Sequence, residues 1–183
     1  EKPPVTMRLG DRWNIGYDDT RFFEADVTVP EHFAGRKLIL TLILGGETIV
    51  RINGRIAGAV NSRENSGWAA RDDIVFPEPF KGGETLHIQL EAAVDCGAFC
   101  DTAMDGGKFM TYTMQKAELR LINEEAEAFY YDINCAYEAY EHTNDVVTAK
   151  KIYNAVERAA HVPDYDAGKK RFYSDVPKAR KVL

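Results

Sequence analysis

One stretch decides the fold of this chain: Leu44-Gly45-Gly46-Glu47-Thr48-Ile49-Val50-Arg51-Ile52-Asn53-Gly54-Arg55-Ile56-Ala57-Gly58. Between Thr48 and Ile52 its residues alternate in the period-two pattern of a half-buried β-strand. Asn53-Gly54 then provides two residues that tolerate positive φ, which a two-residue hairpin turn of the primed type requires. Gly45-Gly46 opens the strand with a reversal that costs little steric strain. The stretch therefore predicts a β-hairpin.

Segments on both sides of this hairpin also predict strands, by apolar–polar alternation or by a short apolar run. These segments are 23–29, 37–44, 73–76, 86–92 and 108–121. Seven or eight short strands with turn signals at regular intervals are typical of an antiparallel jelly-roll sandwich. We therefore expect a mostly β fold, with a β-sandwich over residues 1–122.

The hydrophobic period changes to that of a helix after the last strand. Apolar residues recur at steps of three and four on one helical face: Ala126, Phe129, Tyr130, Ile133, Ala136, Tyr137 and Tyr140. Asn123 is the expected N-cap, and the acidic residues after it suit the positive end of the helix dipole. A second helix is predicted from near Asp145 to a point before Pro163, and Pro177 is expected to break whatever follows. Residues 123–183 are therefore predicted to form a helical hairpin.

Composition and charge indicate a soluble globular chain and argue against two kinds of partner. The 183 residues are 45% hydrophobic and 28% charged, and no apolar run approaches the ~18 residues of a membrane span. Six basic residues between Gly168 and Leu183 stand against Asp175 alone, so the rest carries 17 basic and 28 acidic residues. This acidic body lacks the basic face that nucleic-acid binding needs. We expect no nucleic-acid and no membrane partner, and we interpret the basic end as a solvated helix or linker rather than a tail for an acidic partner.

The cysteines predict neither a disulfide framework nor a metal site. Cys96 and Cys100 lie four residues apart without a second pair or a nearby histidine, which is poor spacing for zinc. We interpret them as two loop thiols.

The order of the glycines, together with the first helix, carries a resemblance to a known family. The run Gly-Gly-Glu-x-x-Val-x-Ile-Asn-Gly-x-x-x-Gly over 45–58 resembles the galactose-binding-like jelly roll at the front of several large glycoside hydrolases. Val27-Thr28-Val29-Pro30 precedes it and Gly82-Gly83-Glu84-Thr85-Leu86 follows it. The helix that contains Ala128-Phe129-Tyr130-Tyr131-Asp132 is similar to the linker that leads into the catalytic domain of bacterial α-mannosidases of glycoside hydrolase family 38.

This resemblance implies that the chain is the N-terminal accessory region of an enzyme. Members of the family are retaining, use one carboxylate as nucleophile and a second as acid/base, and hold a divalent, zinc-like metal at the sugar. Their catalytic domain opens with a His-x-His-x-Asp signature, whereas the four histidines of this chain are never two residues apart. We therefore assign this chain no catalytic, cofactor-binding or metal-ligating residue. We expect the metal in a catalytic domain of the same protein, which is the expected partner, and we expect a cytoplasmic location for the bacterial parent.

Two groups of residues are candidates for a function of the chain itself. One is a sugar-contact loop, in which an aromatic platform stacks on a pyranose beside polar groups: Arg63, Trp68 and Asp72. The alternative for Trp68 is a place at one end of the core, because tryptophan is usually largely buried. The other is an interface on the first helix, which packs on the catalytic domain or supports a homo-oligomer: Phe129, Tyr130, Ile133, Tyr137 and Tyr140.

Two further interpretations of the same pattern stay open. The Asn-Gly hairpin on a jelly roll also occurs in β-galactosidase and β-glucuronidase-type enzymes of family 2, which are expected to continue into another β-sandwich. A freestanding carbohydrate-binding module is the other interpretation, and the predicted helices count against both. The favoured function is a non-catalytic segment that supports domain packing or oligomer contacts.

Overall fold

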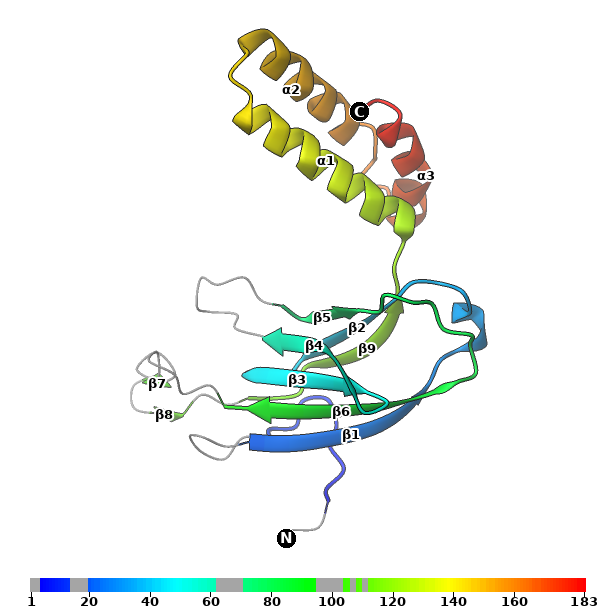
Figure 1. Cartoon of the computed structure of the whole chain (residues 1–183), viewed down its shortest axis with the longest axis vertical. Helices are drawn as coiled ribbons and strands as arrows, with labels where there is room; N and C mark the ends of the chain where they lie inside the picture. The colour runs from blue at the N-terminus through cyan, green and yellow to red at the C-terminus, as the bar shows by residue number, and fades with distance from the viewer. Residues whose placement is uncertain (1–3, 14–19, 62–70, 95–103, 106–107, 110–111) are drawn as a thin grey trace. The chain divides into compact units, whose positions relative to one another are not determined.

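The computed structural model describes residues 4–13, 20–61, 71–94, 104–105, 108–109 and 112–183 (Figure 1). The chain divides into two compact units, Glu1–Leu121 and Ile122–Leu183. The first unit holds the strands and the second holds three α-helices. Strands and helices contribute about equally to the described residues, so the expectation of a mostly β fold applies to the first unit alone.

The first unit contains two larger antiparallel sheets, with the strand orders β1-β6-β3-β4 and β5-β2-β9 (Figure 1). The four-stranded sheet consists of β1 (Thr20–Thr28), β3 (Glu47–Ile52), β4 (Arg55–Asn61) and β6 (Thr85–Ala93). The three-stranded sheet consists of β2 (Leu38–Ile43), β5 (Asp73–Val75) and β9 (Lys116–Leu121). The remaining elements are η1 (Glu31–Phe33), a short 3₁₀ helix, and the paired β7 (Met104–Asp105) and β8 (Lys108–Phe109). The strands predicted over 23–29, 37–44, 73–76 and 86–92 are present. The single strand predicted over 108–121 is wrong, because its described residues form the separate strands β8 and β9.

The two larger sheets share one hydrophobic core. Its buried residues are Val29, Leu38, Leu40, Leu42, Leu44, Val50, Val60, Ile74, Phe76, Leu86, Ile88 and Leu90. Alternation along β3 and β6 sends every second side chain into this core and the others outward, whereas β2 buries three consecutive residues. In β6 the even-numbered residues from Leu86 to Ala92 are buried, which leaves His87, Gln89 and Glu91 on the outer face of the four-stranded sheet.

The Asn53-Gly54 turn closes the β3–β4 hairpin as predicted. Asn53 has a φ of 50° and Gly54 a φ of 76°, the positive values that a primed turn requires. The backbone N–H of Asn53 donates to the carbonyl of His87 at 2.8 Å, and Oδ1 of Asn53 accepts from the N–H of His87 at 2.9 Å. The turn is therefore fixed to β6, the strand that pairs with β3 on its other side.

Close packing at the start of β3 requires the glycine pair. Gly45 and Gly46 have φ values of 77° and 68°, and a Cβ on Gly46 would lie 2.3 Å from the carbonyl oxygen of Ala93. Nearby, the buried Trp13 donates its indole N–H to the carbonyl of Leu44 at 2.8 Å. The segment before β1 is thus anchored in the core by one tryptophan.

The second unit contains α1 (Glu124–His142), α2 (Val146–Ala160) and α3 (Lys169–Arg180). Asn123 and Asp145 cap α1 and α2, because their side chains accept backbone N–H groups at 3.0 and 2.8 Å. The buried core of the unit is formed by Phe129, Ala159, Val176 and Ala179. Among the helices in the described ranges, none has the length and apolar character needed to cross a membrane.

The third helix corrects the predicted hairpin. Pro177 was expected to end any helix, but it lies inside α3. A proline in the last turn removes one backbone hydrogen bond of the helix. Val176 and Ala179 are fully buried in the core shared with Phe129, and this burial offsets the lost bond.

Candidate functional site

The predicted sugar-contact loop lies mostly outside the described residues. Arg63 and Trp68 belong to the range 62–70, and Cys96 and Cys100 also fall outside the description. Asp72 is described: its carbonyl accepts from the N–H of Leu42 at 2.8 Å, and its Oδ1 is buried without a hydrogen-bond partner among the described residues. The proposed grouping of Arg63, Trp68 and Asp72 therefore stays a prediction.

The predicted interface stripe on α1 divides into two parts. Phe129 is 6% exposed and Ile133 packs against the same core, so both residues hold the helical unit together. Tyr130 is 62% exposed and Tyr137 is also exposed, while Tyr140 is half-buried. Only the tyrosines of the stripe are thus available to another surface.

Ring contacts place the tyrosines of α1 and α2 in two groups, one of which contains the half-buried Tyr140. Tyr130 contacts Tyr131 edge-to-face, with ring centroids 5.4 Å apart. Tyr140 contacts Tyr137 at 5.7 Å and Tyr153 of α2 at 5.3 Å. We call Tyr130, Tyr131, Tyr137, Tyr140 and Tyr153 the tyrosine surface. It combines apolar ring area with hydroxyl groups, the composition that is enriched in protein interfaces.

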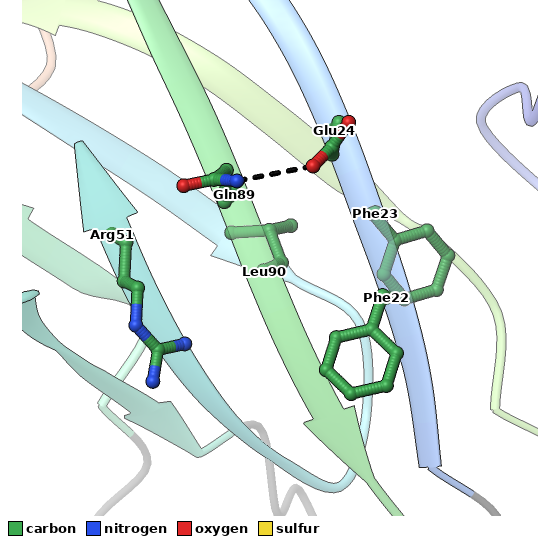
Figure 2. A pocket seen from close by; sticks show the side chains of 6 residues that line it. All are labelled: Phe22, Phe23, Glu24, Arg51, Gln89 and Leu90. Atoms are coloured by element: carbon green, nitrogen blue, oxygen red, sulfur yellow. Dashed lines mark hydrogen bonds between the residues drawn. The ribbon is translucent and has the colours of Figure 1, made fainter. Parts of the chain in front are cut away.

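A shallow pocket of about 270 Å³ lies on the four-stranded sheet (Figure 2). Three neighbouring strands line it, since Phe22, Phe23 and Glu24 come from β1, Gln89 and Leu90 from β6, and Arg51 from β3. Phe23 and Leu90 pack in the core, and the side chains of the other four residues share the outer face by strand alternation. We call Phe22, Glu24, Arg51 and Gln89 the sheet-face site.

Strand register fixes how these four side chains meet. Gln89 pairs directly with Glu24 on one side and with Arg51 on the other. Its Nε2 donates to Oε1 of Glu24 at 3.0 Å, as the dashed line in Figure 2 shows. Nη1 of Arg51 donates to Oε2 of Glu91 at 3.1 Å, and Glu91 pairs with Phe22. Each polar group is therefore held in one orientation by a neighbour on the next strand.

Phe22 is the apolar member of the site, and 73% of it is exposed. The sequence pattern contains its signal, because Phe22 is in phase with Glu24 and Asp26, the polar face of β1. The strand predicted from the sequence begins at Phe23 and so leaves Phe22 out. An aromatic side chain on the polar face of a half-buried strand is the mark that could have identified this surface.

Charged groups elsewhere in the first unit form surface pairs. Nδ1 of His87 lies 2.8 Å from Oδ1 of Asp26 on the outer face of the four-stranded sheet. On the three-stranded sheet, Arg120 donates to Asp73 at 3.3 Å and also to the hydroxyl of Thr41, which itself donates to Asp73. In the described ranges, no cluster of three or more His, Cys, Asp or Glu side chains could hold a metal ion.

The charged groups of the second unit form ion pairs within α3 and between α3 and α1. Lys178 and Arg171 donate to the buried Asp175 at 2.7 and 2.8 Å, and these bonds lower the pKa of its carboxyl. Arg180 donates to Asp132 and Glu125 of α1, and the two carboxylates raise the pKa of its guanidinium. These arrangements are those of structural ion pairs on a helix surface.

The comparisons with known proteins find partial likenesses only. No family model and no curated protein matches the chain. The β-glucosidase from Kluyveromyces marxianus in complex with glucose superposes with a TM-score of 0.37 and 12% identity, over 65% of this chain and 12% of its own. The Se-Met labelled form of that β-glucosidase gives 0.38 and 12%, over 65% and 14%. The chain thus spans a small part of these proteins, and TM-scores at this level do not establish a shared fold.

Proposed function

We propose that this chain is a non-catalytic accessory segment of a glycoside hydrolase, of the α-mannosidase type that its glycine order and first helix resemble. In this proposal the two sheets form a galactose-binding-like jelly roll. The second unit packs against the catalytic domain of the same protein. The retaining chemistry, its two carboxylates and its zinc-like metal belong to that domain.

The tyrosine surface is the observation that carries this proposal. Helices of a small bundle bury their apolar face and expose a polar one, yet α1 exposes Tyr130 and Tyr131 by 62% and 57%. The start of α2 adds Val146 and Val147, which are also exposed. Aromatic rings grouped in this way gain free energy when a second surface removes them from water. A covering domain accounts for them more simply than a solvated helix.

The proposal is tested first by enzymatic assay with added zinc on the full-length gene product and on this chain. We expect hydrolysis of α-mannosides by the full-length protein and none by the chain. Cleavage of β-galactosides or β-glucuronides instead would favour the family 2 interpretation. Hydrolysis by the chain itself would overturn the proposal.

The docking role has its own test, which compares the same variant in two contexts. Tyr130→Ser removes an exposed ring, so it should leave the thermal midpoint of the isolated chain unchanged. In the full-length protein it should lower the midpoint of the helical unit, because the ring is buried there. Tyr173→Ser, on α3 and outside the tyrosine surface, is the matched control. Equal effects of Tyr130→Ser in both contexts would contradict docking.

A second copy of this chain is the alternative partner for the tyrosine surface. Size-exclusion chromatography with light scattering separates the two. A dimer of the isolated chain that Tyr130→Ser dissociates would indicate an oligomer contact. A monomer at all concentrations would leave the catalytic domain as the partner.

A further inference from the structure

We propose that the sheet-face site binds a neutral pyranose, with Phe22 as the stacking platform and Gln89, Glu24 and Arg51 as its hydrogen-bonding groups. The site differs from the predicted loop around Trp68. It goes beyond the accessory function and does not depend on where the second unit docks.

The sheet-face site combines one exposed ring with polar groups that are held in place. A pyranose has an apolar face of C–H bonds and a rim of hydroxyls that both donate and accept. The exposed ring of Phe22 can stack on the apolar face (Figure 2). The amide of Gln89, in the neighbouring row of the sheet, can hydrogen-bond to the hydroxyls. A few placed polar groups beside apolar surface are the general composition of small-molecule sites.

The polar groups of the site are held in place and still have hydrogen-bonding capacity for a ligand. Gln89 uses one amide hydrogen on Glu24 and retains its carbonyl oxygen as an acceptor. Arg51 uses Nη1 on Glu91, and a guanidinium carries five N–H donors in total. Side chains that are already oriented lose less conformational entropy on binding.

The charge and the volume of the site limit the class of ligand that it can bind. Among the described residues that line the pocket, Arg51 is the sole cation, and the carboxylate of Glu91 neutralises it. Glu24 lines the pocket and Asp26 follows on the same face, so an acidic sugar would be repelled. The volume of about 270 Å³ lies below the roughly 300–1,000 Å³ of pockets for drug-sized ligands. A single neutral sugar ring is therefore the ligand class that fits.

The test is an NMR titration of the ¹⁵N-labelled full chain with methyl α-D-mannopyranoside, methyl β-D-glucopyranoside and galacturonate. We expect the amides of β1, β3 and β6 around Phe22, Gln89 and Arg51 to shift with at least one neutral glycoside at millimolar concentration. Galacturonate should bind more weakly than that glycoside. Shifts confined to the range 62–70 or to the helical unit would overturn the proposal, and so would the absence of shifts with every probe.

Variants decide whether the ring is the platform. Phe22→Ala should weaken binding about tenfold, because it removes both the stacking contact and the apolar area. Phe22→Tyr keeps the ring and should bind within a factor of about two of the natural chain. Ile56→Ala, an equally exposed apolar residue on β4 that does not line the pocket, is the matched control and should bind normally. Unchanged affinity of Phe22→Ala would overturn the proposal, as would the same amide shifts on concentrating the protein without sugar, which would indicate self-association.

Discussion

Nε of Arg180 donates to Oδ2 of Asp132 at 2.7 Å and thereby ties the last helix of the chain to the first. Nη1 of the same guanidinium donates to Oε2 of Glu125 at 3.1 Å. Asp132 and Glu125 lie seven residues apart, two turns of α1, so they present their carboxylates on one face of that helix. One side chain on α3 thus contacts α1 at two points, next to the core that contains Phe129 and Ala179.

Arg180→Gln should destabilise the helical unit and leave the sandwich unaffected. The substitution leaves two carboxylates without their shared donor, and we expect the midpoint of helix unfolding to fall by several degrees. Both tryptophans of the chain belong to the first unit. Circular dichroism at 222 nm therefore reports mainly on the helices, while tryptophan fluorescence reports on the sandwich.

The control for this prediction removes the same charge from the same helix. Lys170 is exposed on α3, and Lys170→Gln should shift neither transition. If Lys170→Gln and Arg180→Gln behaved alike, net charge rather than the link to α1 would explain the effect.

Asp175 makes the stability of the helical unit dependent on pH. Hydrogen bonds from Lys178 and the charge of Arg171 lower the pKa of its carboxyl below the usual 3.8. Because the pKa of this carboxyl is lower in the folded chain than in the unfolded chain, its charge stabilises the helical unit at pH values above the unfolded-state pKa. This contribution is lost as the pH falls through the folded-state pKa. We expect the helical transition to lose stability as the pH falls below about 4, toward the lowered pKa of Asp175.

Two variants separate the contributions to this pH dependence. Asp175→Asn should lower stability at neutral pH and flatten the acid slope, because it has no charge to lose. Asp145 also has a lowered pKa, caused first by its hydrogen bond with the Thr148 side chain. Asp145→Asn keeps the N-cap and should remove only its own part of the slope. An unchanged slope in Asp175→Asn would contradict this assignment.

Local patterns predicted the elements of the fold well. The Asn53-Gly54 turn and the caps Asn123 and Asp145 depend on residues within four positions of one another, and the structure has all three. The existence of α3 depends instead on Val176 reaching a core supplied by other helices, and a single sequence does not show this. A local rule for proline was overridden by tertiary burial.

The candidate sites also combine features that local sequence patterns predict with features that depend on tertiary structure. The helical stripe in the sequence contains Tyr130, Tyr137 and Tyr140 but not Tyr131. The pattern also does not separate Phe129, which fills the core, from Tyr130, which is exposed. The sheet-face site depends on register, because Arg51 and Gln89 meet only when β3 pairs with β6. Residues 38 positions apart give no local signal of that pairing.

Gly46→Ala should destabilise the sandwich far more than Gly35→Ala. The two glycines have nearly equal φ values, 68° and 66°, so both substitutions place alanine in the left-handed region at a cost of about 1–2 kcal/mol. A Cβ at position 46 would also meet the backbone oxygen of Ala93 at 2.3 Å, whereas a Cβ at position 35 meets nothing within 4 Å. Denaturant unfolding followed by tryptophan fluorescence measures both. Equal losses would mean that β3 and β6 separate easily at this point.

Two substitutions of Asn53 separate two contributions of the turn to the free energy of unfolding. One is the backbone conformation at Asn53, and the other is its side-chain hydrogen bond to β6. Asn53→Gly keeps the positive φ and loses the acceptor for the N–H of His87, so we expect a loss of about 1 kcal/mol. Asn53→Ala loses the same acceptor and also places a Cβ at a φ of 50°, which should cost roughly 1–2 kcal/mol more. Urea denaturation measures the loss in the free energy of unfolding for each variant, provided that the m-value does not change. If the alanine variant were no less stable than the glycine variant, the hairpin would have taken up a different turn, and the amide of Gly54 would report the change by its chemical shift.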